Sequence, residues 1–209
     1  LSVAAKKSGR VAAEGLVGVH IDNNQACLIE INSETDFVSR NEQFQKFVND
    51  CAKIATTTDG DLDSLLKAKF IDSDNTVEDE LTKNIATIGE NLNIRRIEKI
   101  TLSGPGSIVS YVHNSVSENL GKIAVILSLK SNANQNSLEN VGKKIAMHIA
   151  ASNPISLNLD GLDPKIVNKE KQVLIEQAMS SGKPKDIAEK MVEGRIRKFC
   201  DEVVLLEQT

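Results

Sequence analysis

A stripe of apolar residues with helical spacing lies in the first third of the chain. It comprises Phe44, Phe47, Val48, Cys51, Ala52 and Ala55, at positions i, i+3, i+4, i+7, i+8 and i+11. This recurrence is the period of one face of an α-helix. The pattern predicts a helix over residues 36–55, with Thr35 as its N-cap and Asp36 in its first turn, where a carboxylate suits the helix dipole.

The segments around this helix predict strands and shorter helices. Residues 16–22 and 25–32 are rich in strand-forming residues, and Asn23-Asn24 between them tolerates the positive φ of a tight hairpin turn. Residues 62–70 and 77–91 have the periodicity of short helices, and residues 93–102 that of a strand.

The same pattern returns after the turn-forming sequence Ser103-Gly104-Pro105-Gly106. Residues 107–113 and 120–129 predict a second hairpin, and residues 137–151 predict a second helix. One face of that helix carries Leu138, Val141, Ile145 and Ile149. We therefore expect two related subdomains, each a small antiparallel sheet covered by helices.

The last part of the chain predicts an antiparallel helical hairpin over residues 163–202. Its helices, 164–178 and 184–201, are joined by a short turn in which Gly182 suits a left-handed C′ position and Pro184 a first helical position. The two narrow apolar seams consist of Val167, Leu174 and Ala178 on the first helix, and Ala188, Met191, Val192 and Phe199 on the second.

The predicted fold class is α+β, with two related subdomains and a protruding helical hairpin inserted in the second. The first subdomain covers residues 16–103 and the second covers 104–162 and 203–209, with a returning strand at 203–206. Residues 1–15 are small, basic and Ala-rich, and are expected to be the tail of a helix followed by a linker.

Composition narrows the function. The net charge of −4 argues against a general nucleic-acid binder, and no apolar run approaches the ~18 residues of a membrane span. Cys27, Cys51 and Cys200 are scattered, as in proteins of a reducing compartment. Neither these cysteines nor the three histidines have metal-ligand spacing, so we expect no metal and no cofactor.

No catalytic constellation stands out, so we expect that the protein is not an enzyme. Gly182-Lys183 is followed by Pro and lacks the preceding glycine of a phosphate loop. Cys51 and His148 could pair in space as thiol and imidazole, but nothing in the sequence supports that pairing.

Two segments carry candidate binding residues. Phe37, in Thr35-Asp36-Phe37-Val38, is either a cap on the core or an outward-pointing ring that anchors a partner, with Asp36 beside it. Positive charge gathers on the terminal hairpin, which is either a solvated face or a docking arm for an acidic protein surface. Its basic residues are Lys183, Lys185, Lys190, Arg195, Arg197 and Lys198.

Four motifs resemble signatures of the elongation factor Ts family. They are Thr35-Asp36-Phe37-Val38-Ser39-Arg40-Asn41, Ile88-Gly89-Glu90-Asn91-Leu92-Asn93-Ile94-Arg95-Arg96, His148-Ile149-Ala150-Ala151-Ser152-Asn153-Pro154, and the segment from Ser181-Gly182-Lys183-Pro184 to Gly194-Arg195. They occur in the family's order and spacing over essentially residues 5–207. The family's N-terminal helical domain is matched only by its trailing linker, and family members usually continue beyond residue 209.

The resemblance implies a guanine nucleotide exchange factor of translation elongation. Such a factor binds elongation factor Tu in its GDP-bound and nucleotide-free forms and promotes GDP release by disturbing the Mg²⁺ and phosphate site. No direct nucleic-acid or membrane partner is implied. The expected location is the bacterial cytoplasm, or alternatively a mitochondrial or plastid matrix. The alternative function is that of a translation-associated protein-binding module without exchange activity.

The resemblance also implies which residues contact the partner. It assigns Thr35, Asp36, Phe37 and Val38 to the interface, with Asp36 and Phe37 pushing into the nucleotide-binding domain near its Mg²⁺ site. Ile88 and Gly89 match positions that lie against the same domain. His113 matches, more loosely, a histidine that points towards the phosphate loop. Lys183, Lys185, Lys190 and Arg195 of the hairpin would contact the partner separately.

Overall fold

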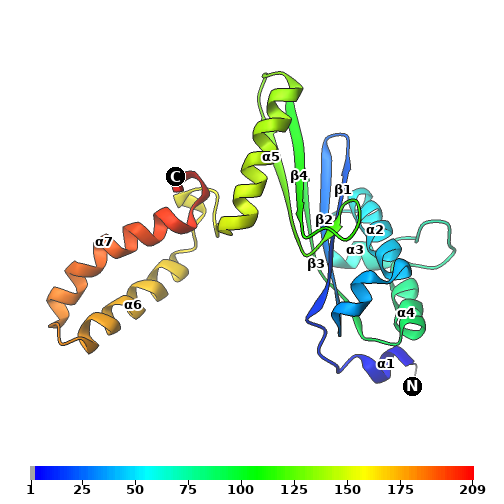
Figure 1. The fold of residues 1–209 in the computed structure, drawn as a ribbon, viewed down its shortest axis with the longest axis horizontal. Coiled ribbons are helices and arrows are strands. Elements are labelled where there is room, and N and C mark those ends of the chain that lie inside the picture. The colour runs from blue at the N-terminus through cyan, green and yellow to red at the C-terminus, as the bar shows by residue number, and fades with distance from the viewer. Residues whose placement is uncertain (1–2) are drawn as a thin grey trace. The chain divides into compact units, whose positions relative to one another are not determined.

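The computed structural model describes residues 3–209 and divides into two compact units, residues 1–150 and residues 151–209. The predicted subdomain boundary at 103–104 lies inside the first unit, so the proposed division into subdomains stays a prediction. The α+β class is confirmed, because small antiparallel sheets and separate helices make up the chain (Figure 1). The short helix α1 (Val3–Lys7) precedes the first strand.

A four-stranded antiparallel sheet forms the centre of the first unit. Its strand order is β3-β2-β1-β5, with β1 at Glu14–Asp22, β2 at Gln25–Ser33, β3 at Leu92–Thr101 and β5 at Leu120–Gly121. The predicted first hairpin is confirmed. Asp22 pairs with Gln25, and Asn23 takes the positive φ of +51° that the tight turn requires.

Helix α2 (Glu42–Thr57) covers one face of this sheet, against β1 and β2 (Figure 1). The predicted apolar stripe is confirmed as the core, because all six of its side chains are at most 2% exposed. The predicted start of the helix at residue 36 is wrong. Residues Asp36–Arg40 form the separate 3-10 turn η1, and α2 begins after Asn41, whose side chain accepts a hydrogen bond from the Phe44 N–H at 3.0 Å.

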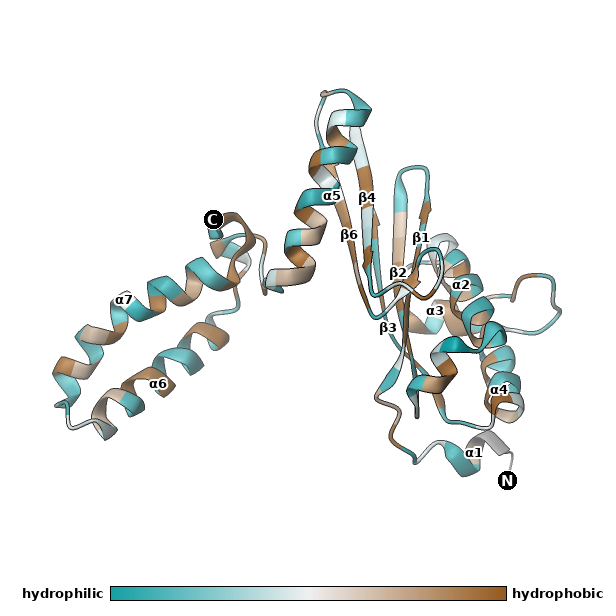
Figure 2. Ribbon diagram, viewed as in Figure 1, coloured by the Kyte–Doolittle hydropathy of each residue, from teal (hydrophilic) through white to brown (hydrophobic). Residues whose placement is uncertain are grey.

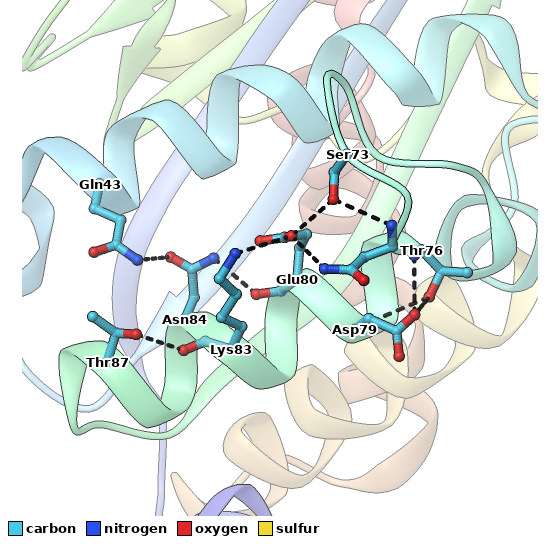
Figure 3. A network of polar contacts seen from close by, with 9 residues as sticks. Gln43, Ser73, Thr76, Asp79, Glu80, Lys83, Asn84 and Thr87 are labelled. Carbon is cyan, nitrogen blue, oxygen red and sulfur yellow. Dashed lines mark hydrogen bonds and ion pairs between the residues drawn. The ribbon is translucent and has the colours of Figure 1, made fainter.

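Two shorter helices, α3 (Leu62–Lys67) and α4 (Val77–Ile88), complete this helical layer. Thr76 and Asp79 form a capping box at the start of α4 (Figure 3). Within α4, the Glu80 carboxylate accepts hydrogen bonds from Asn75, Ser73 and Lys83. These bonds, that of the Asn75 amide most of all, lower the pKa of Glu80, although burial acts to raise it. The predicted end at residue 91 is too late, because Gly89 adopts a left-handed φ of +87° and ends the helix.

A second layer packs on the central sheet. Strands β4 (Gly106–His113) and β6 (Ile123–Lys130) form a two-stranded sheet, and β6 contacts β1, β2 and β3 (Figure 1). The predicted second hairpin is therefore present, but residues 120–121 leave it to pair with β1 as strand β5.

Helix α5 (Gln135–Ser152) covers the two-stranded sheet, with Gly142 against Val109 and Leu129. The predicted face of this helix is partly wrong. Leu138, Gly142 and Ala146 are buried, whereas Val141 is 52% exposed.

The second unit contains the predicted helical hairpin. It consists of α6 (Pro164–Ser180) and α7 (Lys185–Val203), and Gly182 takes the expected left-handed φ of +86° in the turn. Leu174, Ala188 and Val192 form the buried seam, but Met191, expected there, is 52% exposed. Hydrophobic and hydrophilic residues alternate along both helices (Figure 2). Pro184 is the N-cap of α7 rather than its first helical residue.

The predicted strand at 203–206 is wrong. Helix α7 runs to Val203, and the next residues form a single parallel bridge, Ser156 with Val204, followed by the turn η3 (Leu205–Glu207). The Leu205 N–H donates to the Ser156 carbonyl at 2.8 Å and the Leu206 N–H to the Leu157 carbonyl at 3.1 Å, so a few main-chain bonds satisfy these groups without a regular strand. A further 3-10 turn, η2 (Leu159–Gly161), precedes the hairpin. Within residues 3–209, no helix combines the length and apolar character needed to cross a membrane.

Two mid-helix glycines give opposite stability predictions. A Cβ at Gly194 of α7 would have nothing within 4 Å, so Gly194→Ala should stabilise the hairpin by roughly 0.5–1 kcal/mol through reduced backbone entropy of the unfolded chain.

A Cβ at Gly142 of α5 would lie 2.7 Å from Cγ2 of Val109. Gly142→Ala should therefore destabilise α5 by about 1–3 kcal/mol through overpacking. Amide hydrogen exchange within each helix measures both effects, and shifts of the same sign would contradict this account.

Candidate functional site

Phe37 lies in the 3-10 turn η1 and points out of the core. Its side chain is 76% exposed, whereas its neighbours Val38 and Ser39 are 5% and 4% exposed. Val38 belongs to the apolar core beneath α2, so it anchors the turn from below and is not itself available at the surface. The interpretation of Phe37 as a core cap is thus contradicted. An exposed phenylalanine ring beside the exposed Asp36 is left facing solvent.

The N-terminal side of this turn is bound to the end of α4. The carboxylate of Glu90 accepts two hydrogen bonds from Thr35, one from its N–H at 2.9 Å and one from its hydroxyl at 2.5 Å. In return, Glu34 accepts a hydrogen bond from the Asn91 N–H at 2.6 Å. Each turn therefore gives the other a carboxylate acceptor, and hydrogen bonds to ionised groups are the stronger class.

This exchange brings two predicted groups of site residues together. Thr35, Asp36 and Phe37 lie on one turn, and Gly89 lies on the turn bonded to it. Ile88 is the last residue of α4, directly before that turn, and packs partly against the core. Gly89 can take this place because its positive φ turns the chain back immediately after α4. The structure thus joins two motifs that are more than 50 residues apart in sequence into one surface.

The chain before β1 also contacts this surface. The Asn91 side chain donates to the Arg10 carbonyl at 2.7 Å, and the Arg10 guanidinium lies 3.5 Å from the carboxylate of Glu34. Residues predicted to be a linker therefore contribute to holding the two turns.

The C-terminal side of the turn is held through Ser39. Its hydroxyl donates to the Gly15 carbonyl at 3.3 Å, and its own carbonyl accepts from the Gln45 side chain at 2.8 Å. Lys122 also reaches the Ser39 hydroxyl, at 3.3 Å. No local sequence pattern indicates these supports. Glu90 lies inside a family motif, but nothing near it in the sequence points to Thr35, and no local pattern marks Gly15 or Lys122.

His113 is the last residue of β4 and is exposed. Its Nδ1 atom lies 3.0 Å from the hydroxyl of Tyr111, which stands two residues earlier on the same strand face. The carbonyl of His113 accepts a hydrogen bond from the Lys122 N–H at 3.2 Å, and the enlarged turn between them includes positive φ angles at Asn114 and Asn119. His113 therefore lies in the same compact unit as Phe37.

The basic residues of the hairpin form a separate surface in the second unit. Lys183, Lys185, Lys190 and Arg195 are all exposed, but acidic residues alternate with them. Lys185 lies 3.9 Å from Glu189, one turn along α7. The positive charge on the hairpin is therefore less concentrated than the number of its basic residues indicates.

The two cysteines of the first unit are buried in its core. Cys51 is completely buried, and burial raises the pKa of its thiol well above the usual value, which disfavours the thiolate. Burial likewise raises the pKa of Cys27 to about 11. His148 is exposed on α5, away from that core. Within residues 3–209, no three His, Cys, Asp or Glu side chains gather as metal ligands would.

Known proteins resemble this chain over its whole length. The model of the family described as elongation factor TS matches residues 34–209. Proteins called elongation factor Ts from Parvibaculum lavamentivorans and Erythrobacter litoralis are each 50% identical over 208 residues, which cover 100% of this chain and 67% of each relative. The elongation factor Ts of Gluconobacter oxydans is 51% identical, with 68% of its length covered.

The family match covers the candidate site. The two turns joined through Glu90 carry the first two motifs, and the family match includes both of them together with the helical hairpin. Half of all aligned positions are shared with relatives along the full chain. The chain therefore belongs to the elongation factor Ts family of translation elongation factors.

Proposed function

We propose that this chain is a guanine nucleotide exchange factor that binds elongation factor Tu with GDP bound and accelerates GDP release. The observation that carries the proposal is the 76% exposed ring of Phe37 on a turn bonded at both ends. The family and its bacterial members support elongation factor Tu as the partner and the bacterial cytoplasm as the location.

Exchange of this kind is a coupling between two ligands of one protein. A factor that binds nucleotide-free elongation factor Tu more tightly than the GDP form weakens GDP binding by the same ratio. Faster release further requires that the factor bind while GDP is still present. The factor therefore needs contacts that strengthen as the nucleotide site distorts.

Phe37 has the chemistry for such a contact. An exposed apolar ring gains free energy when it leaves water, roughly 2 kcal/mol for a complete burial. A turn that is already ordered loses little entropy on binding, so most of that gain remains available for distorting the partner. Asp36 would present a negative charge beside the ring, towards the Mg²⁺ and phosphate site of the partner.

The other family positions would extend this contact. Ile88 and Gly89 lie at the end of α4, directly before the residue that is bonded to the turn of Phe37, so they would meet the same domain of elongation factor Tu. His113 would approach the phosphate-loop side from the end of β4. The factor would thus displace GDP by its contacts with elongation factor Tu, and no chemical step on the factor itself is required.

Truncation of Phe37 tests the proposal. Elongation factor Tu is loaded with fluorescent GDP and chased with excess unlabelled GDP, and release is followed with and without this chain. The unaltered chain should accelerate release in a saturable manner. Phe37→Ala should slow the stimulated release by about 30-fold or more, because an interface anchor is worth roughly 2 kcal/mol or more.

Val141→Ala is the matched control, since Val141 is also an exposed apolar residue of the first unit, on α5. It should leave release unchanged. Binding without acceleration by the unaltered chain would instead support a docking module that lacks exchange activity. Loss of less than about threefold in Phe37→Ala would remove Phe37 from the proposed mechanism.

The hairpin gives a separate prediction about docking. We propose that Lys183, Lys185, Lys190 and Arg195 attract an acidic surface of the partner. Reversing Lys183 and Lys185 to Glu should weaken binding and reduce its dependence on salt concentration. The same charge change at Lys165 and Lys169, at the other end of the hairpin, serves as the control. Equal salt dependence for both double variants would leave the hairpin tip without a steering role.

A further inference from the structure

Lys122 stands where β5 ends and β6 begins, between the two parts of the candidate site. Its main-chain N–H donates to the carbonyl of His113 at 3.2 Å. Its side chain runs in the other direction, towards β1 and the turn η1. One residue therefore contacts the strand end that carries His113 and the turn that carries Phe37.

The ammonium group of Lys122 has three acceptors. Its Nζ atom lies 3.0 Å from Oε2 of Glu14, 3.0 Å from the Gly15 carbonyl and 3.3 Å from the hydroxyl of Ser39. An ammonium carries three donor hydrogens, so these partners match its full capacity. Ser39 is 4% exposed and stands two residues after Phe37 in the same turn.

Other groups hold the sheet and core around Lys122. Leu120 is completely buried, and residues 120–121 pair with β1 through main-chain bonds. The Lys122 side chain itself remains 36% exposed. Its loss should therefore leave the sheet and core in place and loosen the bonds that join the segment of His113 to the start of β1 and to the turn of Phe37.

We propose that Lys122 is a positioning residue, which fixes the turn of Phe37 relative to the end of β4 so that Phe37 and His113 engage the partner together. The proposal rests on the exchange function above. Small displacements of a contacting group are costly in such a site, because its support decides the geometry with which the group meets its target.

The test uses the GDP-release assay with Lys122→Met. We expect the saturating release rate to fall by roughly tenfold, with little change in the concentration of chain that gives half the effect. Lys122→Arg keeps a charged donor and should restore most of the rate. Because Lys122 acts through Phe37, adding Phe37→Ala to Lys122→Met should cost less than the product of the two single losses.

Lys99→Met is the matched control. Its Nζ atom also donates to a main-chain carbonyl, that of Thr58 at 2.6 Å, but this bond ties β3 to the end of α2 and not to the turn of Phe37. Lys99→Met should leave the saturating rate unchanged. If Lys122→Met does not fold, as judged by its circular dichroism, Lys122→Gln replaces it, since the uncharged amide keeps a polar end group at this partly exposed position.

The outcomes separate this inference from the proposed function. An unaltered chain that binds without accelerating release would overturn the exchange function and this role with it. An unaltered chain that accelerates release, with Lys122→Met equally fast or with Lys99→Met equally slow, would overturn the positioning role alone. Multiplicative losses in the double variant would also contradict it, because independent sites do not share a contact.

Discussion

The candidate site depends on two carboxylates exchanged between neighbouring turns. Glu90 accepts both hydrogen bonds from Thr35, while Glu34 accepts the N–H of Asn91. Bonds to ionised acceptors are strong, and here they replace main-chain partners that neither turn could find within itself. The turn of Phe37 and the end of α4 consequently form one surface, although their residues are far apart in the sequence.

This support explains how a small protein can expose a large apolar ring in a fixed position. Val38 anchors the turn in the core, and the Ser39 hydroxyl bonds to β1. The turn is thus ordered on folding, and its conformational entropy is lost before any partner arrives. A ring on a flexible loop would be displaced when it meets the partner. The turn of Phe37 is held by Glu90, Val38 and Ser39, so its ring can use the free energy of binding to distort the protein that it contacts.

The sequence predicted the longest apolar stripe and the local turn of the first unit, and it missed the polar contacts that shape the site. On the narrower helix faces it was partly wrong, since Val141 and Met191 are exposed. The stripe from Phe44 to Ala55 and the turn at Asn23 followed from periodicity and local φ preference. The break before α2 was missed because the Asn41 side chain caps the Phe44 N–H, in competition with an uninterrupted helix from Thr35. The supports of the site lie 55 residues from Thr35 and 83 from Ser39, beyond the range of any local pattern. Family motifs indicated Phe37 and Gly89, but only the fold shows what holds them.

The most direct test of this account is to observe the Phe37 ring while the partner binds. The chain is labelled with 4-fluorophenylalanine at its five phenylalanines, and the resonance of position 37 is assigned by its loss in Phe37→Leu. On addition of elongation factor Tu with GDP, the fluorine signal of Phe37 should shift strongly, while those of the buried Phe44 and Phe47 stay in place. A complex that forms with the Phe37 signal unchanged would contradict the central claim that this ring enters the partner.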